Sequence, residues 1–136
     1  MEDRSMGSPM TKTEMNKRLV REFYDMAFNQ RKPAEAAAKY VGTRYRQHNP
    51  TVGDGREGFV NGIGGFLSAV PDLHVEFKRL LAEGDLVAVH SQFLPAPGAR
   101  GTAVVDIFRL ENGKIVEHWD VAQDVPEKSA NENTMF

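Results

Sequence analysis

Apolar residues recur at helical spacing through the first half of the chain. Thr11-Lys12-Thr13-Glu14 has the pattern of a capping box, and an apolar stripe follows it to about Asn29, so a helix is predicted there. Pro33 suits the first turn of a second, shorter helix, Ala34 to Val41, that ends at Gly42. A third helix is predicted after Asp54 and before Pro71, with one apolar face made of Phe59, Ile63, Phe66, Leu67 and Val70.

Glycines interrupt the third helix at positions 58, 62, 64 and 65. Each costs about 1 kcal/mol relative to alanine in a helix interior, so a reason for their presence is expected. Close packing of the helix on its neighbours is the favoured interpretation, and room for a ligand beside the backbone is the alternative. The segment between the second and third helices, 43–54, is predicted to be a loop or a short edge strand because Pro50 favours extended geometry at Asn49.

The second half alternates between apolar and polar residues, as strands do. Strands are predicted from Leu73 to Leu81 and from Leu86 to Leu94, followed by a hairpin from Gly101 to Val121. Asn112-Gly113 favours a type I′ turn in that hairpin. The resulting register places one set of residues on a single face: Asp106, Phe108, Leu110, Ile115, Glu117 and Trp119. His118 and Asp120 then fall on the other face, and a one-residue bulge would reverse the faces of the second strand.

Helices followed by a run of antiparallel strands predict an α+β fold with the helices on one face of the sheet. Four long strands twist enough to curl around the helices, which leaves a pocket between the two layers. An acidic residue, Asp106, is predicted among the aromatic and aliphatic residues on the inner face of this sheet.

Composition narrows the functional classes. The 136 residues fit one domain, predicted over 12–136, and the polar residues 1–11 are predicted to be a flexible leader or an expression remnant. A net charge of -2 gives no electrostatic case for a nucleic-acid partner or an acidic membrane surface. No apolar run is long enough to span a membrane, and there is no cysteine for disulfides or thiolate chemistry. With no signal-peptide core, a cytoplasmic protein is expected.

Several ordered motifs resemble those of the SnoaL-like polyketide cyclase family, within the nuclear transport factor 2-like superfamily. The matching segments are Tyr45-x-Gln47-His48-Asn49-Pro50, Gly55–Phe59, Glu83–His90, Asp106–Arg109 and Gly113–Asp120. The resemblance covers roughly residues 17–136. It implies a cone-shaped α+β barrel of the cystatin-like type, in which a strongly curved, mostly antiparallel sheet wraps around three N-terminal helices. It also implies a homodimer formed through the outer face of the sheet.

The same resemblance implies aldol-type ring closure of a small carbonyl substrate, with an acidic pocket residue as general acid/base and no metal or organic cofactor. Asp106 is the residue we match to that role, because burial raises a carboxyl pKa toward the working pH. His90, on the neighbouring strand, is expected to face the same cavity, and His48 is expected near its mouth. A further set is expected to contact a hydrophobic or aromatic carbonyl ligand: Tyr45, Phe59, Phe66, Arg79, Phe108, Glu117 and Trp119.

Other chemistries find less support. His48, His90 and His118 with Asp106 could ligate a metal, but none lies at a short chelating spacing, so no metal is expected. No Gly-x-Ser-x-Gly elbow is present, and Gly53-x-Gly55-x-x-Gly58 does not follow a hydrophobic strand as a nucleotide-binding loop would. Two functions remain: an enzyme that moves protons on a carbonyl compound, and a non-catalytic binding or dimerisation module. Asp106 paired with Arg79, Arg109 or a backbone amide would favour the second.

Overall fold

The computed structural model describes residues 9–136, so most of the predicted leader lies outside the described part. Three α-helices precede and interleave with the first strand: α1 (Lys12–Tyr24), continued by the π-helical turn η1 (Asp25–Asn29), α2 (Pro33–Tyr40) and α3 (Gly55–Ala69). The five strands are β1 (Val41–Gln47), β2 (His74–Glu83), β3 (Leu86–Leu94), β4 (Thr102–Glu111) and β5 (Lys114–Asp124). The α+β class predicted from the sequence is confirmed.

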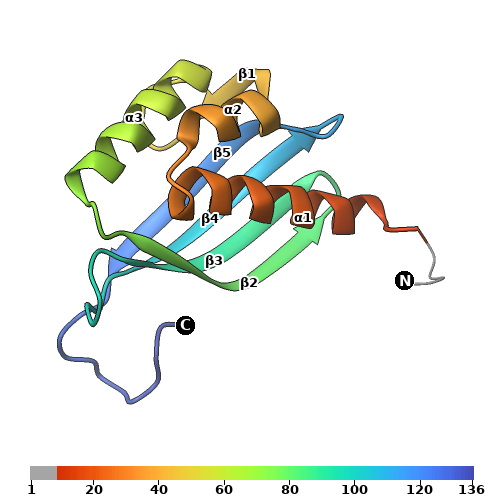
Figure 1. The fold of residues 1–136 in the computed structure, drawn as a ribbon. Helices are drawn as coiled ribbons and strands as arrows, with labels where there is room; N and C mark the ends of the chain where they lie inside the picture. Colours follow the sequence, from red (N-terminus) through yellow and green to blue (C-terminus); the bar gives the residue numbers. More distant parts are fainter. Residues whose placement is uncertain (1–8) are drawn as a thin grey trace.

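The strands form one sheet in the order β1-β5-β4-β3-β2, and the helices lie together on one of its faces (Figure 1). All neighbours are antiparallel except β1, which runs parallel to β5. The sheet is therefore mostly antiparallel, as expected, and it is not closed into a barrel, because β1 and β2 are free edges. In the part of the chain that the structure describes, no helix is both long and apolar enough to cross a membrane.

Local sequence signals explain the helix ends. The capping box at α1 is present, with the Thr11 amide donating to Glu14 Oε1 at 2.8 Å and the Glu14 amide donating to Thr11 Oγ1 at 3.2 Å. Helix α2 does not need the predicted stop at Gly42, because the chain passes directly into β1 at Val41. The segment that was predicted to be a loop or edge strand thus begins with an edge strand.

The π-helical turn joins the helical layer to the edge strand β2. The Asn29 side chain donates to the Val75 carbonyl at 3.0 Å and accepts from the Val75 amide at 2.8 Å, as a neighbouring strand would. These two bonds satisfy backbone groups that an edge strand otherwise leaves unpaired. Tyr24, the last residue of α1, lies immediately before this turn and is fully covered by the sheet.

Aromatic side chains fill the space between the layers. Phe23 contacts the rings of Tyr40, Phe59 and Phe108 at centroid distances of 5.3–6.2 Å. Gly58 is required by packing, because a Cβ there would lie 2.0 Å from the Gly53 carbonyl oxygen. The packing interpretation is right for Gly58, whereas a Cβ on Gly64 would have no neighbour within 4 Å.

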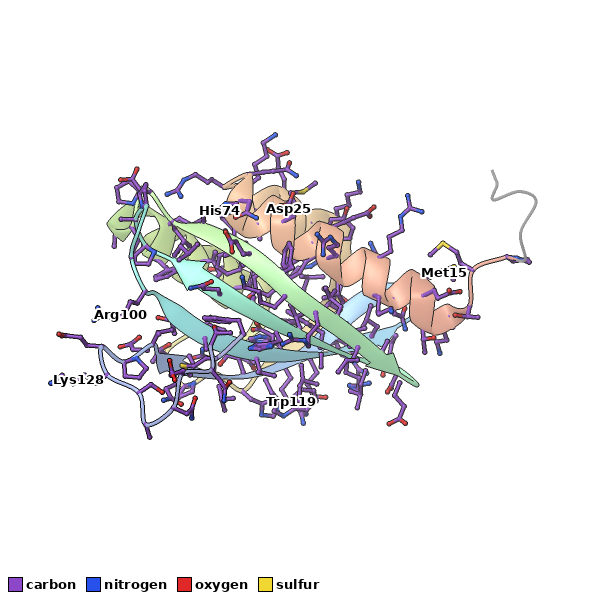
Figure 2. The ribbon with its side chains drawn as sticks, turned by 90° about the horizontal axis from the view of Figure 1, so that it is seen from below. Met15, Asp25, His74, Arg100, Trp119 and Lys128 are labelled. Carbon is purple, nitrogen blue, oxygen red and sulfur yellow. The ribbon has the colours of Figure 1, made fainter. Side chains whose placement is uncertain are left out.

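Two β-bulges change the faces that simple alternation predicted. In the β4–β5 hairpin, Leu110 pairs with Ile115 but Arg109 pairs with Glu117, so Val116 is the extra residue. His118 and Asp120 consequently share the inner face with Asp106, and Glu117 and Trp119 point outward, which is the reverse of the predicted register. Figure 2 shows Trp119 on the side of the sheet away from α1.

The second bulge lies in β2, where Phe77 pairs with Ser91 and Arg79 pairs with His90. Lys78 is the extra residue, and the bulge turns Arg79 to the outer face. Uninterrupted alternation from Leu73 to Leu81 would instead have placed Arg79 on the inner face, where it was expected to contact the ligand.

Candidate acid–base site

A cavity of about 490 Å³ lies between the helices and the inner face of the sheet. Its walls are largely aromatic, from Phe23 and Tyr24 on α1 to Phe59 and Phe66 on α3. Five of the residues predicted to form the site line it: Asp106, Tyr45, Phe59, Phe66 and Phe108. Five of its polar lining residues are joined by contacts between side chains of β4, of β5 and of the end of β1: Gln47, Asn49, Asp106, His118 and Asp120.

Asp106 is the most deeply buried acid of this group, with 3% of its surface exposed. Its Oδ2 accepts a hydrogen bond from the Tyr24 hydroxyl at 2.7 Å, and its Oδ1 lies 2.7 Å from His118 Nε2. No arginine pairs with it within the described residues, so the ion-pair alternative does not apply here. Tyr24 comes from helix α1 and His118 from β5, which means that the site exists only when both layers are packed.

Gln47 determines the tautomer of His118. The Asn49 backbone amide donates to Gln47 Oε1 at 3.0 Å, and a backbone N–H can only donate, so this side-chain atom is the oxygen. The same oxygen lies 2.8 Å from His118 Nδ1, which we therefore assign as protonated. In a neutral imidazole, Nε2 would then be an acceptor facing Asp106, so one further proton must lie between Nε2 and Oδ1. The Asp106–His118 pair thus holds a single shared proton.

Asp120 is the second carboxylate of the site. It lies opposite Asp106 across the β4–β5 ladder, and its Oδ2 is 3.7 Å from His118 Nε2. Asn49 Nδ2 lies 2.9 and 3.0 Å from the two carboxylate oxygens of Asp120, and 19% of the Asp120 side chain is exposed. Two carboxyl groups in different environments are therefore held around one imidazole.

The electrostatic environment favours the protonated forms of the buried groups. Burial raises the pKa of Asp106 above its ordinary value, although the hydrogen bond from His118 works in the opposite direction. Burial and the adjacent Asp106 raise the pKa of Tyr24 well above its usual range, so its hydroxyl remains a donor. Burial likewise raises the pKa of Tyr45, which accepts a hydrogen bond from Gln47 Nε2 at 3.0 Å.

Three ligand atoms, one each from Asp106, His118 and Asp120, lie within 4.8 Å of one another and could hold a cation. Each of the three side chains also has a hydrogen-bonding partner that orients it: Tyr24, Gln47 and Asn49 respectively. The 2.7 Å separation of Asp106 Oδ1 and His118 Nε2 is that of a strong hydrogen bond. Asp106 Oδ1 and His118 Nε2 are thus also arranged to share a proton.

His90 was predicted to face the cavity, and that prediction is wrong. Its neighbours Val89 and Ser91 are fully buried on the inner face, so the alternation of β3 turns His90 outward. There it contacts Arg79 and stacks on the C-terminal Phe136, with ring centroids 5.7 Å apart. The last aromatic residue therefore docks on the outer face of the sheet, and neither His90 nor Arg79 lines the cavity.

His48, Glu117 and Trp119 also lie outside the cavity. His48 Nε2 is 2.7 Å from Glu117 Oε2, and its ring is parallel to that of Trp119 at 4.9 Å between centroids. The hydrogen bond from His48 and the adjacent Arg109 lower the pKa of Glu117. Their predicted roles at the pocket fail for two reasons. The bulge at Val116 turns Glu117 and Trp119 outward, and the alternation of side chains from Tyr45 to Asn49 turns His48 outward.

Five polar residues of the site were not among the predicted site residues: Tyr24, Gln47, Asn49, His118 and Asp120. Four of them belong to the motifs 45–50 and 113–120 already noted in the sequence. Alternation places Gln47 and Asn49 on the same side as Tyr45, which could have identified them. His118 and Asp120 could be recognised only by placing a bulge after Ile115, and no residue type marks that position.

Comparisons with known proteins agree with this architecture. A model of the SnoaL-like polyketide cyclase family matches residues 18–128. TsrD from Streptomyces laurentii is 28% identical and superimposes with a TM-score of 0.68, over 84% of this chain and 91% of TsrD. No curated protein matches the chain.

Two further solved structures are less similar in sequence and show the fold alone. A candidate polyketide cyclase from Bacillus cereus is 23% identical, with a TM-score of 0.70 over 83% of this chain and 78% of its own. Bal32a, from a soil-derived mobile gene cassette, is 17% identical, with a TM-score of 0.71 over 84% and 93%. The family match extends over most of the sequence, from α1 to the segment after β5. The chain therefore belongs to the SnoaL-like polyketide cyclase family.

Proposed function

We propose that the protein is an enzyme that moves protons on a small, uncharged carbonyl compound bound in the cavity. The observation that carries the proposal is the buried Asp106–His118 pair, whose 2.7 Å contact opens onto an aromatic cavity. A group that holds a proton in a dry site is suited to general acid catalysis, which contributes about 10²- to 10⁴-fold in rate. Aldol-type cyclisation, dehydration and double-bond isomerisation all use such a group.

The lining supports an uncharged substrate. Among the described residues that line the cavity, the ionisable side chains other than tyrosine are Asp106, His118 and Asp120, and none is lysine or arginine. A carboxylate or phosphate on the substrate would have no cationic partner there and would face Asp120. The aromatic walls favour a flat, apolar body instead.

The two carboxyl groups divide the chemistry. Asp120 accepts the proton from the carbon next to the carbonyl group, and the shared proton of Asp106 and His118 passes to the oxygen where negative charge develops. Tyr24 and Gln47 hold the pair in place during this transfer. In ring closure, the proton on Asp120 then replaces the one that the Asp106–His118 pair gave to the oxygen. In isomerisation, the Asp120 proton returns to another carbon of the substrate while the oxygen gives its proton back to the pair, so the protein ends in its starting state in both cases.

The test uses exchange of carbon-bound hydrogen, which does not require the natural substrate. Aromatic ketones such as 1-tetralone are incubated with the protein in deuterated buffer, and loss of the proton next to the carbonyl group is followed by NMR. We expect the wild type to accelerate exchange and Asp106→Asn to lose about 10²-fold or more of that acceleration. Asp72→Asn, an exposed carboxylate that is not among the residues lining the cavity, is the matched control and should behave as wild type.

Equal exchange by Asp106→Asn and wild type would remove the mechanism. Ligands that bind in the cavity but exchange no faster than in buffer would instead favour the non-catalytic binding module.

A further inference from the structure

His48 lies on the outer face of the sheet but belongs to the segment that holds the site. Its two chain neighbours both point inward: Gln47 binds His118, and Asn49 binds Asp120. On β5, the residue between His118 and Asp120 is Trp119, which points outward. The segments 47–49 and 118–120 therefore lie side by side in register. Gln47–His118 and Asn49–Asp120 are contacts on the inner face, and His48–Trp119 is the contact on the outer face.

The outer contact is the stack of the His48 ring on Trp119, with the ring planes 4° apart. It is reinforced by Glu117, which lies 2.7 Å from His48 Nε2 and also accepts from Arg109 Nε at 2.9 Å. Glu117 and Trp119 project outward, as β5 alternates, so His48 is held by two neighbours of the same face. Side-chain contact on both faces fixes the separation of the two segments.

The backbone alone holds this end of β1 weakly. The His48 amide donates to the His118 carbonyl at 3.0 Å, and two residues later Pro50 has no amide with which to continue the ladder. β1 is an edge strand with a neighbour on one side only. The ends of such strands open locally unless side chains hold them.

We propose that His48 is a positioning residue of the acid–base site, acting through Gln47 and Asn49 by its stack on Trp119. This inference rests on the proposed function of the site but concerns a contact outside the cavity. Loss of the stack lets the end of β1 move away from β5. Gln47 Oε1 then no longer fixes the His118 tautomer, and Asn49 no longer holds Asp120.

The direct readout is the Nδ1–H of His118, observed by ¹⁵N NMR of the folded protein. In the wild type we expect a protected Nδ1–H, because it donates to Gln47. His48→Ala should speed its exchange by about tenfold or more, as local opening becomes easier. His48→Phe keeps a ring for Trp119 and should remain within about twofold of wild type, which also keeps the test decisive if His48→Ala unfolds.

His90→Ala is the matched control, because His90 is also an outer-face histidine stacked on an aromatic ring. Its neighbours Val89 and Ser91 hold neither His118 nor Asp120, so His118 exchange should not change. Equal exchange in wild type and His48→Ala would overturn the proposal, and so would a His48→Phe variant that exchanges as fast as His48→Ala.

Turnover gives a second readout that separates the two proposals. With a ketone that the wild type turns over, His48→Ala should lower kcat and leave KM nearly unchanged, since the aromatic walls on α1 and α3 that would bind the ketone are not altered. If the wild type turns over no ketone, the proposed function fails, while the NMR comparison still decides whether His48 positions His118.

Discussion

The hydrogen bond between Tyr24 and Asp106 can be tested by removing a single atom. Tyr24→Phe deletes the hydroxyl that donates to Asp106 Oδ2 at 2.7 Å. The ring itself is retained, with its edge-to-face contacts to Phe77, Phe93 and Phe108 at 5.5–6.1 Å. Because the apolar packing survives, the change in stability reports the hydrogen bond alone.

The expected loss follows from burial. Tyr24 is 2% exposed and Asp106 is 3% exposed, so bulk water has little access to the oxygen that loses its donor. Leaving a buried hydrogen-bonding atom without its partner costs about 1–3 kcal/mol, and we expect a loss of about 2 kcal/mol in the free energy of unfolding. With a urea dependence of about 2 kcal/mol per molar, the unfolding midpoint should fall by about 1 M.

Tyr40→Phe is the matched control. The Tyr40 hydroxyl is 3.5 Å from Glu22 Oε1, a long contact to an exposed carboxylate, so its loss should cost less than about 0.5 kcal/mol. The Tyr24 hydrogen bond also lowers the pKa of Asp106, so Tyr24→Phe should raise that pKa further in a ¹³C carboxyl titration. A Tyr24→Phe variant as stable as Tyr40→Phe, with an unchanged Asp106 pKa, would refute the arrangement.

Three other predictions concern the folded chain. Gly58→Ala should be strongly destabilised because its Cβ would meet the Gly53 carbonyl group. Gly64→Ala has open space around the new Cβ, so its free energy of unfolding should rise by about 1 kcal/mol. Thermal unfolding of the two variants measures both effects. Burial raises the Asp106 pKa, so the folded state holds the proton of the Asp106 carboxyl group more tightly than the unfolded chain does. The contribution of this proton to the free energy of unfolding is lost as pH rises through the folded-state pKa. Asp106→Asn should therefore gain stability relative to wild type with rising pH, by at most about 1.4 kcal/mol per pH unit in urea titrations, and a constant difference would contradict it. We also expect a homodimer through the outer sheet face, where Val121 is 72% exposed, so Val121→Glu should yield monomers in light scattering; a monomeric wild type would rule this out.

Short-range signals determined much of the architecture from the sequence alone. The capping box, the apolar stripes and the Asn112-Gly113 turn fix the helices and the hairpin through contacts within a few residues. The same reasoning placed Asp106 on the inner face among Phe108 and Leu110, because β4 keeps strict alternation up to the bulge. Family motifs then indicated the class of fold.

Only the tertiary structure decided which residues join Asp106. An extra residue at Val116 inverts every later side chain of β5, and it exchanges Glu117 and Trp119 for His118 and Asp120. Tyr24 reaches Asp106 across 82 positions of sequence, so no local pattern connects them. Alternation with a period of two residues predicts which face of a strand each side chain occupies. It cannot predict where a bulge shifts that alternation, since the position of a bulge depends on packing against neighbouring strands and helices.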